Sequence, residues 1–285
     1  MILQRRDVGV AWAWSVRAVF AVLVAVLPTA SASADAECVA RDFLSLDLPE
    51  RVADPVVAAL SAAYPMLTIV SGDVRVPDGT VVPLGADRGL AARERIAAPT
   101  VVEQFTDVYP LGFDLDARRT PWFDPGRARN DAFFRALYFS SRETAAATMT
   151  EVTYRGTSAP VPFVVTTKHC VAAQLSAALG EIEAMGPEMA RYFRRVGGGF
   201  NWRNIAGTTR LSAHSFGIAV DFDTELGGYW RWSGRAEGAA GDYVNRYPEE
   251  LVLAMERRGF IWGGKWHHFD GMHFEYRPEL ILFSR

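Results

Sequence analysis

Two segments in the last third of the chain carry side chains that can bind a metal ion. Residues 211–221 contain His214 and Asp221, and residues 262–276 contain His273. Two imidazoles and one carboxylate suit Zn²⁺, and three protein ligands leave its fourth tetrahedral position open, as in catalytic zinc sites. Such an ion lowers the pKa of a bound water to about 7 and polarises a carbonyl group. We therefore predict a zinc site at His214, Asp221 and His273.

The residue pattern around these ligands predicts the strands that position them. In both segments apolar and polar residues alternate, which indicates β-strands, with Asp221 and His273 on the faces opposite the apolar side chains. His214 precedes the first strand, and Gly217 between them permits a bend or a close backbone approach. We expect this bend to bring the imidazole of His214 to the carboxylate of Asp221.

The combined pattern resembles a known family. It reads Ser-x-His-x-x-Gly-x-Ala-x-Asp over residues 212–221 and Asp-x-x-His over residues 270–273. This resembles the D-alanyl-D-alanine carboxypeptidase family of zinc peptidases, with the vancomycin-resistance D,D-peptidases and phage L-alanyl-D-glutamate endolysins as relatives. The resemblance is clear over about 197–278, weaker from about 124, and not visible over 35–120. It implies the fold of the Hedgehog and D,D-peptidase domains, an α+β fold with a small antiparallel sheet and flanking helices.

The resemblance also implies roles for individual residues. His214, Asp221 and His273 match the zinc ligands, and Asp270 matches the catalytic acid that precedes the last ligand by three residues. An Asp at this position is more like the endolysin branch, since many D,D-dipeptidases have Glu there. Arg203 matches an arginine that stabilises the polarised carbonyl or the substrate, which agrees with the action of a guanidinium beside a developing oxyanion. The implied reaction is hydrolysis of peptidoglycan stem peptides, by a D,D-carboxypeptidase or an L-alanyl-D-glutamate-type endopeptidase.

Four further polar residues compete for these roles. His267 and His268 are adjacent, so on a strand they would point to opposite faces and could not both bind the ion. We interpret His268 as structural and His267 as lying near the pocket. Glu275 is on the same strand face as the last ligand, and we interpret it as holding a ligand histidine or Arg203 rather than as the acid–base group. Asp223 is interpreted as a strand-end acid.

Two other functions remain open from the sequence. One is a non-catalytic zinc-containing module, as in the Hedgehog domain, although the presence of both Asp270 and Arg203 favours an enzyme. The other is a wall-binding protein that uses an aromatic cleft without cutting. Such a cleft, or alternatively core packing, would use the aromatic residues near the site, namely Tyr229, Trp230, Trp232, Trp262 and Trp266.

The N-terminus has the pattern of a secretory signal peptide. Arg5 and Arg6 precede an apolar run over residues 18–27, and a small-residue stretch favours cleavage after Ala34. A retained anchor is the alternative, but the run is shorter than the ~20 residues of a spanning helix. We therefore expect an exported protein, in the periplasm, cell envelope or extracellular space, without a stable transmembrane segment after cleavage of residues 1–34.

The net charge and the glycine-rich segment give no indication of a nucleic-acid or nucleotide partner. Cleavage takes the formal net charge from −3 to −5, because it removes three arginines and one aspartate, so we expect no nucleic-acid partner. We interpret Gly197-Gly198-Gly199 as a loop and expect no nucleotide, since the Lys-Ser/Thr ending of a phosphate loop is absent.

Strand and helix patterns alternate irregularly, which favours α+β over a doubly wound sheet. We predict a helix over residues 171–185, a helix over about 54–63 and a hairpin over 67–82. We assign residues 35–120 to an N-terminal extension and 121–285 to the zinc peptidase domain, with the site in a groove on the open face of the sheet.

Two cysteines follow the signal peptide. In an oxidising compartment Cys38 and Cys170 would form a disulfide that ties the mature N-terminus to the domain. The alternative is two separate thiols, with Cys170 as a small core residue.

Overall fold

The computed structural model of the protein describes residues 2, 9, 38–48, 53–240 and 243–285. The chain divides into two units, Met1–Ala36 and Glu37–Arg285, and the elements below belong to the second. The predicted signal peptide, apart from positions 2 and 9, lies outside the described residues. Within the described part of the chain, every helix is too short or too polar to cross a bilayer.

Helices and strands are mixed along the chain, which confirms the predicted α+β class. The α-helices are α1 (Pro55–Ala63), α2 (Ala92–Ala97), α3 (Asp131–Leu137), α4 (Arg142–Ala146), α5 (Val171–Met185), α6 (Thr224–Gly227), α7 (Glu249–Arg257) and α8 (Pro278–Phe283). The strands are β1 (Thr68–Val70), β2 (Asp73–Arg75), β3 (Val81–Pro83), β4 (Met149–Tyr154), β5 (Val161–Thr166), β6 (Val196–Gly198), β7 (Ala219–Asp223), β8 (Phe260–Trp262) and β9 (His273–Tyr276).

The strands form three small antiparallel sheets. Their orders are β1-β2-β3, β4-β5 and β6-β7-β9-β8. The hairpin predicted over residues 67–82 is wrong in its strand number, since this region has three strands. The chain already reverses at Ser71 and Gly72, where φ is +53° and +82°, so the predicted range contains one more turn and one more strand than a hairpin has.

Helix ends follow the local sequence. Asp54 caps α1 by accepting a hydrogen bond from the Val56 amide at 2.8 Å, and Pro55 occupies the first helical position. The helix α5 spans the predicted range and ends at Gly186, whose φ of +129° is costly for residues with a Cβ.

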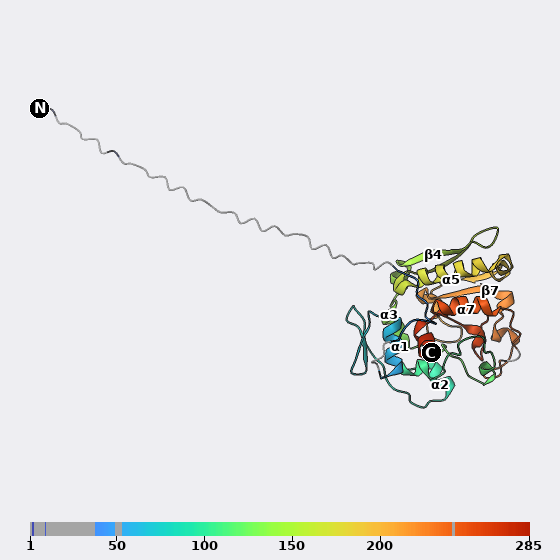
Figure 1. Ribbon diagram of the computed structural model, residues 1–285. Coiled ribbons are helices and arrows are strands. Elements are labelled where there is room, and N and C mark those ends of the chain that lie inside the picture. The colour runs from blue at the N-terminus through green and yellow to red at the C-terminus, as the bar shows by residue number, and fades with distance from the viewer. Residues whose placement is uncertain (1, 3–8, 10–37, 49–52, 241–242) are drawn as a thin grey trace. The chain divides into compact units, whose positions relative to one another are not determined.

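One buried apolar cluster runs from the N-terminal to the C-terminal part of the second unit. α5 packs against β4 and α7, as Figure 1 shows, and α1 packs against α8. Phe43, Leu60 and Tyr64 are fully buried in the same cluster as Phe274 and Ile281. Residues 38–120 therefore contribute side chains to the core that supports β9.

Cys38 and Cys170 form a disulfide, as predicted. It joins the start of the second unit to the residue that precedes α5, across a sequence separation of 132 residues. A crosslink over such a long loop removes much of the conformational entropy of the unfolded chain.

We predict that replacing both cysteines by serine lowers the free energy of unfolding by about 2–5 kcal/mol, because the unfolded chain regains the entropy that the disulfide removes. Urea unfolding of the metal-loaded protein measures the change. Dithiothreitol should destabilise the wild type and leave the double variant unaffected. Equal stability of the wild type and the double variant would contradict the assigned role.

Candidate metal centre and active site

The register of the four-stranded sheet brings two of the predicted ligands together. β7 pairs antiparallel with β9, and in this pairing Asp221 lies directly opposite His273. Residues that face each other across two strands point to the same side of the sheet. The carboxylate Oδ1 of Asp221 is 2.9 Å from Nδ1 of His273.

The third predicted ligand comes from a short 3-10 turn, Ala213–Phe216, just before β7. Ser212 caps this turn, with its hydroxyl 3.4 Å from the amide nitrogen of His214. Gly217 ends it with φ of +66°, and a Cβ there would lie 2.7 Å from the thioether of Met149 and 2.9 Å from the amide nitrogen of Thr166. Glycine is therefore required where the chain bends from the turn into the strand, as the sequence suggested.

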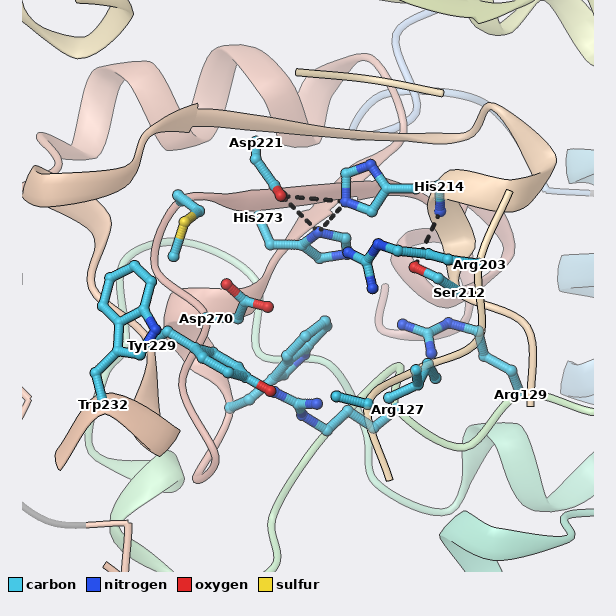
Figure 2. Close-up of a pocket in the computed structure, with 14 residues that line it drawn as sticks. Arg127, Arg129, Arg203, Ser212, His214, Asp221, Tyr229, Trp232, Asp270 and His273 are labelled. Carbon is cyan, nitrogen blue, oxygen red and sulfur yellow. Dashed lines mark hydrogen bonds and ion pairs between the residues drawn. The ribbon is translucent and has the colours of Figure 1, made fainter. Parts of the chain in front are cut away.

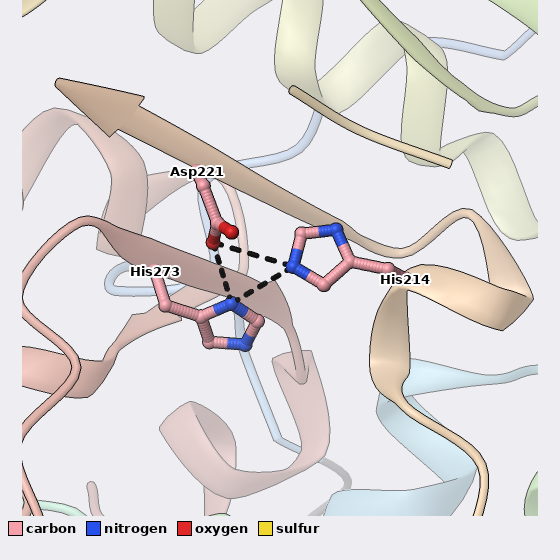
Figure 3. A group of neighbouring side chains, drawn as sticks. All are labelled: His214, Asp221 and His273. Atoms are coloured by element: carbon pink, nitrogen blue, oxygen red, sulfur yellow. Dashed lines mark hydrogen bonds and ion pairs between the residues drawn. The ribbon is translucent and has the colours of Figure 1, made fainter. Parts of the chain in front are cut away.

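The geometry of the three side chains fits a tetrahedral metal ion (Figure 3). The Nε2 of His214 is 3.2 Å from Nδ1 of His273 and 3.3 Å from Oδ1 of Asp221, and the remaining edge of this triangle is 2.9 Å. Ligands bound to zinc at 2.0–2.1 Å with tetrahedral angles are about 3.3 Å apart. His214, Asp221 and His273 thus have the donor types and spacing of a zinc site, and all three are at least largely buried.

Hydrogen bonds on the far side of each imidazole set which nitrogen faces the centre. Nδ1 of His214 is 2.7 Å from the carbonyl oxygen of Gly199, which can only accept, so this nitrogen donates and Nε2 presents its lone pair. Nε2 of His273 lies 3.5 Å from Glu275, so Nδ1 presents its lone pair. Two lone pairs and the carboxylate of Asp221 therefore meet at one point, which favours a cation there.

Glu275 lies at the centre of a buried chain of charges behind His273. Its two oxygens accept from Nε (2.6 Å) and Nη2 of Arg129, and Nη1 of Arg277 lies 3.3 Å away. Burial raises the pKa of Glu275, but the charge of Arg129, the hydrogen bond to His273 and the charge of Arg277 together hold it well below its usual range. The interpretation that Glu275 contacts one of the predicted ligand histidines is confirmed. Its arginine partners are Arg129 and Arg277 rather than Arg203.

This chain of charges continues to the N-terminal part of the second unit. Nε of Arg277 donates to Glu279 at 2.5 Å, and the hydroxyl of Tyr64, one residue after α1, donates to the same carboxylate at 2.8 Å. Both Arg277 and Glu279 are fully buried. Residues 38–120 therefore reach the metal centre indirectly, through hydrogen-bonded side chains as well as through the core.

Asp270 faces the three ligands across the pocket (Figure 2). Its backbone is fixed, because its amide donates to the carbonyl of Gly263 at 3.0 Å and its own carbonyl accepts from the amide of His273 at 3.1 Å. Its carboxylate makes no hydrogen bond or ion pair with any described residue. Burial raises the pKa of Asp270, the nearby charge of Asp221 adds to this, and His273 opposes it. This carboxyl is therefore free to exchange a proton.

A buried lysine holds the turn that carries Asp270. Lys265 is fully buried, and its Nζ donates to Glu256 on α7 and to the carbonyls of Pro110 (2.8 Å) and Gly112. Burial lowers the pKa of Lys265, and the adjacent Glu256 carboxylate offsets this only in part. The turn before Asp270 is thus fixed from two other segments of the chain.

Arg203 also reaches the pocket. Its amide is held by the hydroxyl of Ser215 at 2.9 Å, while its guanidinium has no hydrogen bond or ion pair to any described residue. Figure 2 shows the side chain directed toward the two ligand histidines. The pocket holds about 250 Å³ and is lined by Arg127, Arg129, Arg203, Ile205, Ala206, Ser212, His214, Asp221, Tyr229, Trp232, Trp266, Asp270, Met272 and His273.

Two pocket arginines were not found from the sequence. Arg127 and Arg129 follow a turn in a segment without regular secondary structure, so no periodicity indicated the direction of their side chains. Residues 124–127, Asp-Pro-Gly-Arg, are typical of a turn, but this sequence does not indicate that the turn lies beside the metal centre. Only their tertiary contacts, with Trp266 for Arg127 and Glu275 for Arg129, place them there.

The remaining sequence interpretations have mixed outcomes. His268 is structural, since its Nδ1 is 2.6 Å from Asp124 and its Nε2 accepts from the amide of Gly238 at 2.9 Å. His267 does not line the pocket, and its Nδ1 lies 3.1 Å from the carbonyl of Arg118. Asp223 caps α6, which confirms its assignment as a strand-end acid.

The loop predicted at Gly197-Gly198-Gly199 is in part a strand, and the aromatic residues near the site divide between the pocket and the core. Residues 196–198 form the edge strand β6 instead of a loop, because they pair with β7, and a Cβ at Gly197 would lie 2.7 Å from that of Asp221. Among the five aromatic residues, Tyr229, Trp232 and Trp266 line the pocket, whereas Trp230 and Trp262 are buried away from it.

Comparison with known proteins agrees with this geometry. Residues 206–276 match the family model described as D-alanyl-D-alanine carboxypeptidase. The segment that carries the site is therefore similar to this family of peptidases. The matched segment contains the three ligand residues and Asp270, whereas Arg203 precedes it. No curated protein and no solved structure matches the chain. The predicted resemblance is therefore confirmed at the level of the peptidase family, without a distinction between its subtypes.

We predict that Glu275→Gln weakens zinc binding about 10- to 100-fold, because the amide loses the charge that orients His273. Competition with a chromogenic chelator measures the affinity. The matched control is Glu151→Gln on the exposed edge of β4, which should bind zinc like the wild type. His214→Ala should lose the ion altogether. Wild-type affinity in Glu275→Gln would show that the carboxylate does not support the centre.

A second prediction concerns pH. Burial lowers the pKa of His273, but its hydrogen bonds to Asp221 and Glu275 outweigh this and raise it to about 9 in the metal-free protein. This proton stabilises the metal-free fold fully below the unfolded value of about 6.5, and the contribution is lost as the pH rises through about 9. Zinc needs the neutral imidazole, so its affinity should fall as the pH drops below about 9.

Urea unfolding of the metal-free protein between pH 6 and 10 tests the first part, and zinc titrations over the same range test the second. We expect the stability of the metal-free protein to decrease from pH 7 to 9 while zinc affinity increases. His273→Ala is the reference variant, whose metal-free stability should lack this dependence. A metal-free wild type that becomes more stable over this range would contradict the assignment.

Proposed function

We propose that the protein is a zinc-dependent peptidase that hydrolyses peptidoglycan stem peptides. The observation that supports this most is the position of Asp270. Its carboxyl group has no partner among the described residues, burial raises its pKa, and it faces a set of three ligands already oriented for a cation. A purely structural zinc site would have no need for an unpartnered acid at this position.

The chain's own groups divide the work of peptide hydrolysis. A zinc ion, when bound by His214, Asp221 and His273, supplies a Lewis acid that polarises a peptide carbonyl and makes water more acidic. Asp270 accepts the proton of the attacking water and then delivers it to the leaving amine. A raised pKa suits both halves of this transfer. The guanidinium of Arg203 donates to the carbonyl oxygen as negative charge develops on it.

Two activities fit this site, a D,D-carboxypeptidase and an L-alanyl-D-glutamate-type endopeptidase. The family description that residues 206–276 match names the first. The Asp at position 270 favours the second, because the resemblance assigns Asp to the endolysin branch and Glu to many D,D-dipeptidases. Both act on peptide bonds of the same polymer, and their products differ in mass.

We propose that the protein acts outside the cytoplasm. The predicted signal peptide of residues 1–34 supports export, and the disulfide between Cys38 and Cys170 supports an oxidising compartment. Peptidoglycan lies in that compartment. No nucleic-acid or nucleotide partner is indicated.

We predict that Asp270→Asn keeps its zinc and lowers kcat on peptidoglycan fragments at least 10²–10⁴-fold, because the amide cannot carry the proton between water and amine. Metal content is measured by elemental analysis and turnover by mass spectrometry of the released peptides. The masses of the products also identify the bond. Zinc removal by a chelator should abolish turnover, and zinc addition should restore it.

Glu151→Gln, at an exposed acid on β4 that does not line the pocket, is the matched control and should retain both zinc and turnover. Full activity of Asp270→Asn would disprove the assigned acid–base role. Muropeptides that bind tightly but remain uncut, with binding that persists after chelation, would support the wall-binding alternative instead.

A further inference from the structure

We propose that Arg127 and Arg210 form a carboxylate-binding subsite beside the metal centre, through which the enzyme prefers peptides that carry a free acidic group near the cleaved bond. This inference rests on the proposed peptidase function and specifies the substrate class of the same site. The observation behind it is a cluster of three guanidinium groups, those of Arg127, Arg129 and Arg210, whose charges the described carboxylates neutralise only in part.

The subsite lies where two hollows adjoin. The pocket with the metal ligands shares Arg127, Ile205 and Tyr229 with a second hollow of about 80 Å³. Arg210 lines this second hollow, together with the rings of Trp122 and Trp230, the ion pair between Arg231 and Glu237, and Asp124. A peptide bound at the metal centre can therefore extend past Arg127 into a space where Arg210 is the guanidinium without an ion pair among the described residues.

Arg210 lacks a counter-ion. Its Nη1 donates to the backbone carbonyl of Arg127 at 3.2 Å, and its guanidinium has no ion pair among the described residues. Burial, the charge of Arg129 and the charge of Arg127 lower the pKa of Arg210 to about 10, and Asp131 and Glu275 offset this only in part. A partly buried guanidinium crowded by like charges gains stability from an anion placed beside it.

Arg127 is only weakly neutralised. Its guanidinium lies 4.5 Å from the ring centre of Trp266, and its Nη2 donates to the backbone carbonyl of His268. Its nearest carboxylate oxygen, on Asp124, is 3.7 Å from Nε. That carboxylate already accepts hydrogen bonds from the amide (2.8 Å) and from the ring of His268. Arg129 differs from Arg127, since both oxygens of Glu275 bind it. Positive charge is therefore available at Arg127 and Arg210 and not at Arg129.

The chemistry of these groups selects a carboxylate. A guanidinium presents parallel N–H donors that match the two oxygens of a carboxylate, and aromatic walls strengthen the bond by excluding water. A carboxylate in the first pocket would meet the like charges of Asp270 and Asp221. In the second hollow the two carboxylates already have partners, His268 for Asp124, and Arg93 and Arg231 for Glu237. The acidic group of the substrate therefore lies on the side of Arg210, displaced from the bond that is cleaved.

Two stem-peptide fragments that differ only in one group test the inference. Both fragments are complete stem peptides, so each contains the bond that either proposed activity would cut. In one fragment the glutamate has a free α-carboxylate, and in the other this group is a carboxamide. We expect the wild type to favour the acid on the order of 10- to 100-fold in kcat/KM, as for a charge-assisted hydrogen bond. Arg210→Met should reduce this preference at least several-fold, and Arg210→Lys should retain part of it.

Arg142→Met, at an exposed arginine on α4 outside both hollows, is the matched control and should retain the wild-type preference. Melting temperature and zinc content verify that each variant is folded and loaded. Equal cleavage of both fragments by the wild type would overturn the subsite while leaving the peptidase function intact.

Absence of cleavage of both fragments would instead contradict the proposed function. Calorimetric titration of the wild type with the same two fragments then still decides the inference. Tighter binding of the acid, lost in Arg210→Met, would support the subsite, and equal binding would overturn it.

Discussion

The site depends on a buried ion pair between Glu275 and two guanidinium groups. Glu275 and Arg277 are fully removed from solvent, and Arg129 is nearly so. Isolated charges in such surroundings are very costly, and loss of one partner of a buried pair typically costs about 3–5 kcal/mol. The carboxylate therefore stays ionised and in place, and it presents an oxygen to the outer nitrogen of His273. The orientation of one metal ligand thus follows from charges that never touch the metal.

The ion pairs also explain why side chains from distant parts of the chain are needed to hold Glu275 and His273 on β9. The arginines come from the irregular segment before α3 and from the end of β9, and Tyr64 completes the chain of hydrogen bonds from the end of α1. The family match covers only residues 206–276, which contain the ligands but neither Arg129 nor Tyr64. The part of the chain that resembles the family therefore relies on side chains from outside the matched segment.

The approach of His214, Asp221 and His273 to one another and the α+β class could both be predicted from the sequence, because both depend on local order. The alternation of apolar and polar residues predicted which face of its strand Asp221 occupies, and likewise for His273. The antiparallel pairing of β7 with β9 places these two residues opposite one another. The third strand at residues 68–83 was missed because its extra turn uses Ser71 in a left-handed conformation, which has no distinctive residue type. Arg127 and Arg210 were missed for a different reason. Arg127 and Arg210 lie in two segments without regular secondary structure. The spacing of residues in the sequence does not predict that these segments lie side by side.

The two histidine ligands are oriented by different kinds of acceptor. His273 uses a side-chain carboxylate, whereas His214 uses the backbone carbonyl of Gly199. A side-chain acceptor can be exchanged by a single codon change, so the electron donation of His273 is open to adjustment during evolution. A peptide carbonyl is present whatever residue occupies the position, and at Gly199 a Cβ would lie 2.2 Å from the carbonyl oxygen of Val164. A single substitution can therefore change the hydrogen-bond acceptor of His273, whereas the acceptor of His214 is a main-chain carbonyl that substitution does not remove.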